Sequence, residues 1–227
     1  MSELEQGFLA VHILSGFVAL LVAPGAMISH KGSRWHRRWG GVFVLAMALV
    51  AATAVFLSFT GTDPFLFLLA IFAFYLVFSG WRVLRRKRLR EGERVPVLDW
   101  VVTGGTLVAS LALVGYGLWQ LASGAGFGAV AVAFGGIGCA FSGRDLKHLY
   151  QPPEEKRWWW FVHMGNMLAA YIATVSAFSA VNLDFLPPLA RWLWPTVVGT
   201  PLIFLWVGYY KRRFARRKGS SDRVGEA

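Results

Sequence analysis

Long apolar runs alternate with short clusters of basic residues along this chain. All of the 23 Lys and Arg residues except Arg191 fall in four clusters. These clusters lie at residues 31–38, 82–94, 144–157 and 211–223. The connections that contain them alternate with connections nearly free of Lys and Arg. This is the positive-inside pattern of a polytopic membrane protein, in which basic loops stay on the cytoplasmic side.

The apolar runs have the length of membrane spans, because about 20 residues of helix cross a hydrocarbon core of about 30 Å. Seven runs pass this test, near residues 7–29, 40–60, 64–84, 99–121, 125–143, 158–181 and 192–210. Backbone groups in lipid must be satisfied internally, so runs of this length predict helices. We expect an all-α bundle of seven transmembrane helices over residues 1–210. A basic, disordered cytoplasmic tail is expected at residues 211–227.

The orientation of the bundle follows from the same charges. Basic loops come after the first, third, fifth and seventh runs, which places the N-terminus outside and the C-terminus in the cytoplasm. We expect the first run to be retained as a span. Glu3 and Glu5 precede it, whereas a signal peptide opens with positive charge.

Composition supports a membrane protein and argues against nucleic-acid binding. Hydrophobic residues make up 56% of the chain, and the mean hydropathy is +0.51. The net charge of +11 sits in short loops and the tail, where contact with anionic lipid headgroups explains it. No basic soluble domain is present to hold nucleic acid. The single Cys139 rules out an intramolecular disulfide.

Glycines inside the runs predict close helix packing. The chain has 25 glycines, and the spacing Gly124-x-x-x-Gly128 lies at the start of the fifth run. Small residues let helix backbones approach closely where no hydrophobic force drives association. We expect them to tighten one bundle; a homo-oligomer face and a flexible gate are the alternatives.

His163 is the most informative candidate for chemistry. It lies inside the sixth run, and an ionisable residue at such depth usually faces the bundle interior or a cavity. Asn166, Met167, Tyr171 and Thr174 follow it at helical spacing and share its face. Three roles stay open for His163: an interhelical hydrogen bond, a ligand to metal or haem, and a proton relay.

Other ionisable residues converge on the same cytoplasmic-side layer. His36 lies at the mouth of the second run, Asp99 begins the fourth, and Asp145 and His148 lie near the cytoplasmic end of the fifth. Asp99 is also explained by a favourable helix N-terminus, and Arg82 by snorkelling to the interface. Imidazole and carboxylate suit zinc or iron. The candidate metal ligands are therefore His36, Asp145, His148 and His163.

Two imidazoles at matched depth would suit a six-coordinate haem b, for which His163 and His36 are the candidate ligands. His12 lies near the opposite face and has no second histidine there, which excludes a bis-histidine haem on that side. A candidate polar path consists of Tyr171, Thr174, Asn166, Asp99 and Arg82.

Several segments resemble a family of bacterial predicted membrane proteins that is a domain of unknown function. They are His12-x-x-x-Gly16, Lys31-Gly32-x-x-x-His36-Arg37-x-x-Gly40, Ser79-Gly80-Trp81-Arg82 and Tyr171-Ile172-Ala173-Thr174-x-x-Ala177-Phe178. The similarity runs from the first span to the seventh and ends at Trp194-Pro195-Thr196 and Gly199-Thr200-Pro201. The resemblance implies the topology above and draws attention to His12, His36 and His163. It implies no reaction.

Two functions of different class fit these observations. In the first, the cytoplasmic-side layer binds a divalent metal or haem and performs redox or hydrolytic chemistry in the bacterial inner membrane. In the second, the chain is a non-enzymatic small-solute or proton transporter, a channel, or a structural component. No nucleotide-binding loop, dinucleotide fingerprint, His-Glu-x-x-His or Gly-x-Ser-x-Gly motif is present, so no catalytic residue is assigned.

Overall fold

A computed structural model describes residues 2–61, 63–87 and 94–224, with side chains to residue 215. Within these residues the chain is entirely helical, and all seven helices are long and apolar enough to cross a membrane. They are α1 (Glu3–Ile28), α2 (Arg34–Gly61), α3 (Pro64–Arg86), α4 (Val97–Ala122), α5 (Gly128–Tyr150), α6 (Trp158–Asn182) and α7 (Pro188–Val224). The predicted fold class, a seven-helix membrane protein, is confirmed.

Local sequence signals start two of these helices. Ser2 caps α1 through a capping box, in which the Glu5 N–H donates to Ser2 Oγ and the Ser2 N–H donates to Glu5 Oε2. Asp63 caps α3, because its carboxylate accepts a hydrogen bond from the Phe65 N–H at 2.9 Å. Pro64 follows at the first helical position, where its missing N–H costs nothing.

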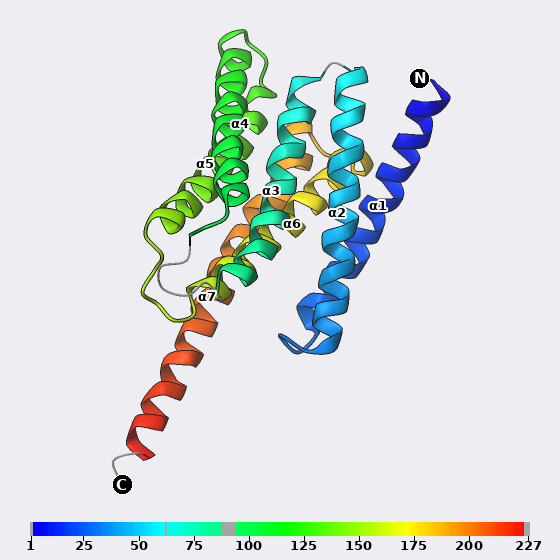
Figure 1. Ribbon diagram of the computed structural model, residues 1–227. Coiled ribbons are helices and arrows are strands. Elements are labelled where there is room, and N and C mark those ends of the chain that lie inside the picture. The colour runs from blue at the N-terminus through cyan, green and yellow to red at the C-terminus, as the bar shows by residue number, and fades with distance from the viewer. Residues whose placement is uncertain (1, 62, 88–93, 225–227) are drawn as a thin grey trace.

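Two helix pairs flank a central pair. α1 packs on α2, α4 packs on α5, and α3 with α6 lies between them (Figure 1). α7 packs on α6 and touches α5 only sparsely. The C-terminal part of α7 extends away from the other helices (Figure 1). The central pair therefore contacts helices on both sides, so side chains of α3 and α6 can bond to side chains of several other helices.

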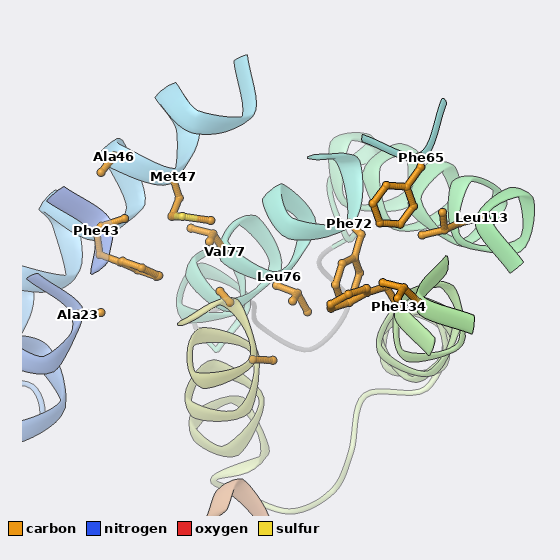
Figure 2. Close-up of a cluster of buried hydrophobic side chains, with 14 of the residues drawn as sticks. Ala23, Phe43, Ala46, Met47, Phe65, Phe72, Leu76, Val77, Leu113 and Phe134 are labelled. Atoms are coloured by element: carbon orange, nitrogen blue, oxygen red, sulfur yellow. The ribbon is translucent and has the colours of Figure 1, made fainter. Parts of the chain in front are cut away.

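The apolar core follows α3 across the bundle. Figure 2 shows Phe65 and Phe72 of α3 beside Phe134 of α5, while Val77 at the other end of the row faces Met47 of α2. All five side chains are buried. Aromatic and branched side chains of this size fix the relative positions of the helices, because core packing leaves few voids. The layer of polar side chains described below lies on α3 beyond this core.

Small residues bring α4 and α5 together, as the glycine pattern predicts. A Cβ added at Gly117 would lie 2.6 Å from the carbonyl oxygen of Gly128, and one at Gly135 would lie 2.8 Å from that of Ser110. Gly124 itself adopts φ +83° in the turn between the helices, a conformation that glycine reaches without strain. Gly136, by contrast, faces open space.

Several helices extend beyond the apolar runs that predict them. α2 begins at Arg34 instead of residue 40, and α5 continues to Tyr150 instead of residue 143. α7 continues past residue 210 and ends at Val224. Hydropathy reports only the part of a helix that suits lipid, whereas Lys, Arg and Ala prolong a helix into the polar region.

Candidate functional site

Gly80 allows α3 and α6 to approach closely beside His163. A Cβ at Gly80 would lie 3.1 Å from the Asn166 Cβ, so a larger residue would push α6 away. The His163 Nδ1 lies 2.8 Å from the Gly80 carbonyl oxygen. Because that oxygen only accepts, Nδ1 carries the proton and donates. His163 thus makes the interhelical hydrogen bond that is one of its three expected roles.

His36 is held in a similar way by α1. Its Nδ1 lies 2.9 Å from the Ala26 carbonyl oxygen, in the last turn of that helix. The ring centres of His36 and His163 are 6.2 Å apart, and the ring planes are inclined at 77°. Among the described residues, every hydrogen bond of the two rings runs through Nδ1. Neither Nε2 has a hydrogen-bond partner within the part of the chain that the structure describes.

Lys31 closes the C-terminal end of α1 beside this histidine pair. Its ammonium donates to the carbonyl oxygens of Met27 and Ala26, two of the groups that a helix end leaves without partners. Burial lowers the pKa of the Lys31 ammonium. Lys31 and Lys87 also place positive charge near His163. The pair therefore lies in an electropositive environment.

Asp145 is the centre of a separate buried network. Its carboxylate accepts hydrogen bonds from Tyr75 Oη at 2.8 Å and from Arg144 Nη2 at 2.7 Å. Asn166 Nδ2 also donates to it at 3.3 Å. Asp145 is fully buried, so these donors replace the water that its charge loses. The network joins α3, α5 and α6.

Asn166 completes this network. Its Oδ1 accepts from Arg144 Nη2 at 2.6 Å, and its Nδ2 donates to Ser79 Oγ at 2.6 Å. Tyr75, Ser79 and Arg144 are not among the residues that the sequence singles out as site candidates. Tyr75 and Ser79 lie four residues apart in an apolar run, and this spacing of two polar residues on one helical face could have indicated them.

Arg82 and Asp99 form an ion pair between α3 and α4. Arg82 Nε donates to Asp99 Oδ1 at 3.1 Å, and Nη2 donates to Oδ2 at 2.7 Å. This two-point geometry is the strong form of an arginine–carboxylate pair. The Arg82 side chain is 11% exposed and that of Asp99 is 3% exposed. Each residue thus has a charged partner. The sequence suggests only that Arg82 snorkels to the interface and that Asp99 favours a helix N-terminus.

His148 lies apart from the other histidines. Its ring packs against Trp158, with ring centres 5.5 Å apart, and its buried Nδ1 has no hydrogen-bond partner among the described residues. Arg86 also faces Trp158, with Cζ 5.9 Å from the ring centre. The Nε and Nη1 atoms of Arg86 are buried and likewise lack a described partner. His148 and Arg86 form a second polar cluster.

The four candidate metal ligands do not gather in one place. Within the described parts of the chain, no three His, Cys, Asp or Glu side chains come close enough to hold an ion. The structure brings His36 to His163, whereas Asp145 is occupied by its three donors. His12 lies elsewhere, with Nδ1 3.0 Å from Thr53 Oγ1. Among the described residues, the candidate ligands that lie close to one another are His36 of α2 and His163 of α6.

Thr174 and Tyr171, two residues of the expected polar path, make contacts outside the Asp145 network. Thr174 Oγ1 donates to the Ala170 carbonyl oxygen at 3.0 Å and to the Met47 sulfur at 3.4 Å. Tyr171 packs against the apolar core. Neither of them bonds to Asn166, which belongs to the Asp145 network. The residues of the path therefore serve separate contacts in the described structure.

Comparison with known proteins gives one finding. Residues 9–117 match the model of a family of predicted membrane proteins, DUF2306. The expected resemblance to such a family is confirmed over this part of the chain. The match includes His12, His36, Gly80 and Arg82, and it ends within α4. The same comparisons give no match among curated proteins and none among solved structures.

Proposed function

We propose that the protein holds one metal centre between His36 and His163. The observation that carries this proposal is the pairing of two imidazoles from α2 and α6 at a ring-centre separation of 6.2 Å. Metal–imidazole bonds are about 2.0–2.1 Å long, so two rings that share one ion through Nε2 place their centres roughly 5–6.5 Å apart, with the longer separation for ligands on opposite sides of the ion. The distance between the two ring centres and the unbonded Nε2 atoms both support one metal ion held between His36 and His163.

The second shell of each ring supports this function. A metal-binding histidine almost always donates its other ring N–H to a carbonyl, carboxylate or water, which fixes the tautomer and orients the ring. His36 and His163 both do so, to the carbonyl oxygens of Ala26 and Gly80. Both rings are therefore already in the tautomer that leaves Nε2 as the ligand.

The occupant we propose is a divalent ion such as zinc or iron. Imidazole suits both ions, and two protein ligands leave coordination positions for water or an anionic substrate. Positive charge from Lys31 and Lys87 near His163 favours an anionic ligand at those positions. Iron in haem b is the alternative occupant, because two axial imidazoles can hold it at the same spacing.

Binding is tested by thermal unfolding of the protein in mild detergent with added zinc, iron(II) or haemin. A ligand that binds the folded state raises the unfolding temperature. We expect a rise for wild type that is absent in His36→Gln and in His163→Gln, since glutamine keeps a donor for the carbonyl but is a poor ligand. His12→Gln, in a histidine bonded to Val50 and Thr53, is the matched control and keeps the rise.

Two outcomes would count against the centre. One is an unfolding temperature that no metal or haemin changes. The other is an equal rise in wild type and in both site variants, which would place binding elsewhere.

A second candidate function is supported by the Asp145 network. Its hydrogen bonds join α3, α5 and α6, as expected for a polar lock in a structural component or a carrier. In that case the histidine pair would add only interhelical contacts. Proteoliposomes that show solute or proton flux, lost in Asp145→Asn while the metal content stays zero, would favour this function.

The setting that we propose for this centre is the bacterial inner membrane, with the N-terminus outside. The basic clusters at residues 31–38, 82–94, 144–157 and 211–223 support this orientation, and so does their expected contact with anionic headgroups. In this orientation the histidine pair lies near the cytoplasmic face.

A further inference from the structure

A cleft runs between α5, α6 and α7. Its volume is about 540 Å³. The middle of the cleft is apolar and is lined by Ile137 and Phe141 of α5, Ala169 and Ile172 of α6, and Ile203 and Phe204 of α7. α5 and α7 make few contacts with each other. Both of these helices, which border the cleft, therefore also face lipid.

One end of the cleft is basic. Arg144, His148 and Lys211 line it, together with Glu155 and Trp158. The charge of Arg144 is already matched by Asp145 at 2.7 Å. Lys211 lies over the Phe161 ring at 5.3 Å and has no carboxylate partner among the described residues. Glu155 is exposed, so water screens its charge.

Arg86 does not line the cleft itself, but it packs against Trp158, which does. Its residue exposure is 8%, and its Nε and Nη1 atoms have no partner among the described residues. A buried charge without a partner is costly, and the Trp158 ring 5.9 Å away offsets only part of that cost. His148, whose buried Nδ1 is also without a described partner, lies against the same tryptophan. These groups would be satisfied by an anion at the cleft end.

We propose that this cleft holds one acyl chain of an anionic membrane lipid, with its phosphate beside Arg86, His148 and Lys211. The apolar middle matches the chain and the basic end matches the headgroup. A guanidinium binds phosphate through two parallel N–H groups, which suits a buried arginine. The volume lies within the range of about 300–1,000 Å³ for small-molecule sites, which suits one chain. The proposal does not depend on the metal centre.

The experiment is native mass spectrometry of the full chain in detergent, titrated with phosphatidylglycerol, phosphatidylcholine or oleate. We expect tight binding of one phosphatidylglycerol and weak binding of phosphatidylcholine. Arg86→Gln should weaken phosphatidylglycerol binding about tenfold or more, as the loss of a charged hydrogen bond predicts. Arg38→Gln removes the same charge from an exposed position over Trp35, and should change binding less than about twofold.

A second variant tests the apolar part of the site without touching a charge. Ala173 of α6 lines the cleft, so Ala173→Phe should fill it and displace the bound lipid. This variant keeps the test decisive if Arg86→Gln fails to fold. Equal binding of phosphatidylglycerol and phosphatidylcholine, or unchanged binding in Ala173→Phe, would overturn the proposal. Tighter binding of oleate than of phosphatidylglycerol would overturn it in favour of a free fatty acid.

Discussion

At the scale of single residues, several buried polar side chains are held by partners on other helices. Asp145 has donors from α3, α5 and α6, Asp99 has Arg82, and each site histidine has a backbone carbonyl. Burying such groups is favourable only when their hydrogen bonds are made. Few of these interior polar residues can therefore be replaced without leaving a hydrogen-bonding partner unpaired.

Asp145 gives the most direct test of this dependence. Asp145→Ala leaves Tyr75 and Arg144 without their shared acceptor, and breaking a buried ion pair costs roughly 3–5 kcal/mol. We expect the lower end, roughly 3 kcal/mol, because the Arg144 side chain is 35% exposed. The readout is thermal unfolding in detergent, with exposed Asp184→Ala as the control that should change little. Equal stability of the two variants would show that the network contributes nothing.

The sequence identifies some of these residues better than others. His163, Asn166 and Asp145 stand out because ionisable or amide groups are rare at membrane depth. Their partners do not, since hydrogen bonds such as Tyr75 to Asp145 join positions 70 residues apart. Only the packing of α3 against α5 and α6 brings such positions together. Asp145, His148 and His36 are expected to lie together only because they lie at a similar depth in the membrane. Depth does not determine which face of its helix a residue occupies, so it cannot show whether these side chains meet.

At the scale of helices, close approach depends on where glycine faces a neighbour. Gly135 and Gly136 are adjacent on α5 and provide a matched pair. A Cβ at Gly135 would meet the Ser110 carbonyl oxygen at 2.8 Å, whereas one at Gly136 would meet nothing within 4 Å. Gly135 therefore lies on the face of α5 that packs closely against α4, whereas Gly136, the next residue, does not.

Alanine at these two positions should have opposite effects. Gly135→Ala should destabilise the protein by about 1–3 kcal/mol, as overpacking does. Gly136→Ala should be neutral or stabilise it by up to about 1 kcal/mol, because alanine is the better helix former. Unfolding temperatures measured in one detergent compare the two. A loss of stability in Gly136→Ala that equals the loss in Gly135→Ala would contradict the α4–α5 interface described above.

Helix number is well predicted from the sequence, whereas helix ends are not. Apolar runs of about 20 residues identify every one of the described helices, since lipid imposes that length. The same runs miss the start of α2 at Arg34 and the continuation of α7 past residue 210. Charged residues can be helical outside the hydrocarbon, and a hydropathy pattern carries no signal for such turns.

At the scale of the whole molecule, the basic segments should determine how the bundle is inserted. We expect alkaline phosphatase fused after residue 227 to be inactive, since it needs the oxidising side of the membrane to form its disulfides. The same enzyme fused within the turn at residues 123–127 should be active. The measurement is the phosphatase activity of each fusion protein, divided by the amount of that protein in the cells. The reverse pattern would invert the orientation and place the histidine pair near the outer face.

The central claim is that His36 and His163 together bind one metal, and its most direct test is the content of the protein as purified. The chain is isolated in mild detergent without chelator, and its elemental composition and absorption spectrum are measured beside those of His36→Gln, His163→Gln and His12→Gln. We predict one zinc, iron or haem per chain in wild type and in His12→Gln, and loss from the two site variants. A folded wild-type protein that contains neither metal nor haem would contradict the claim.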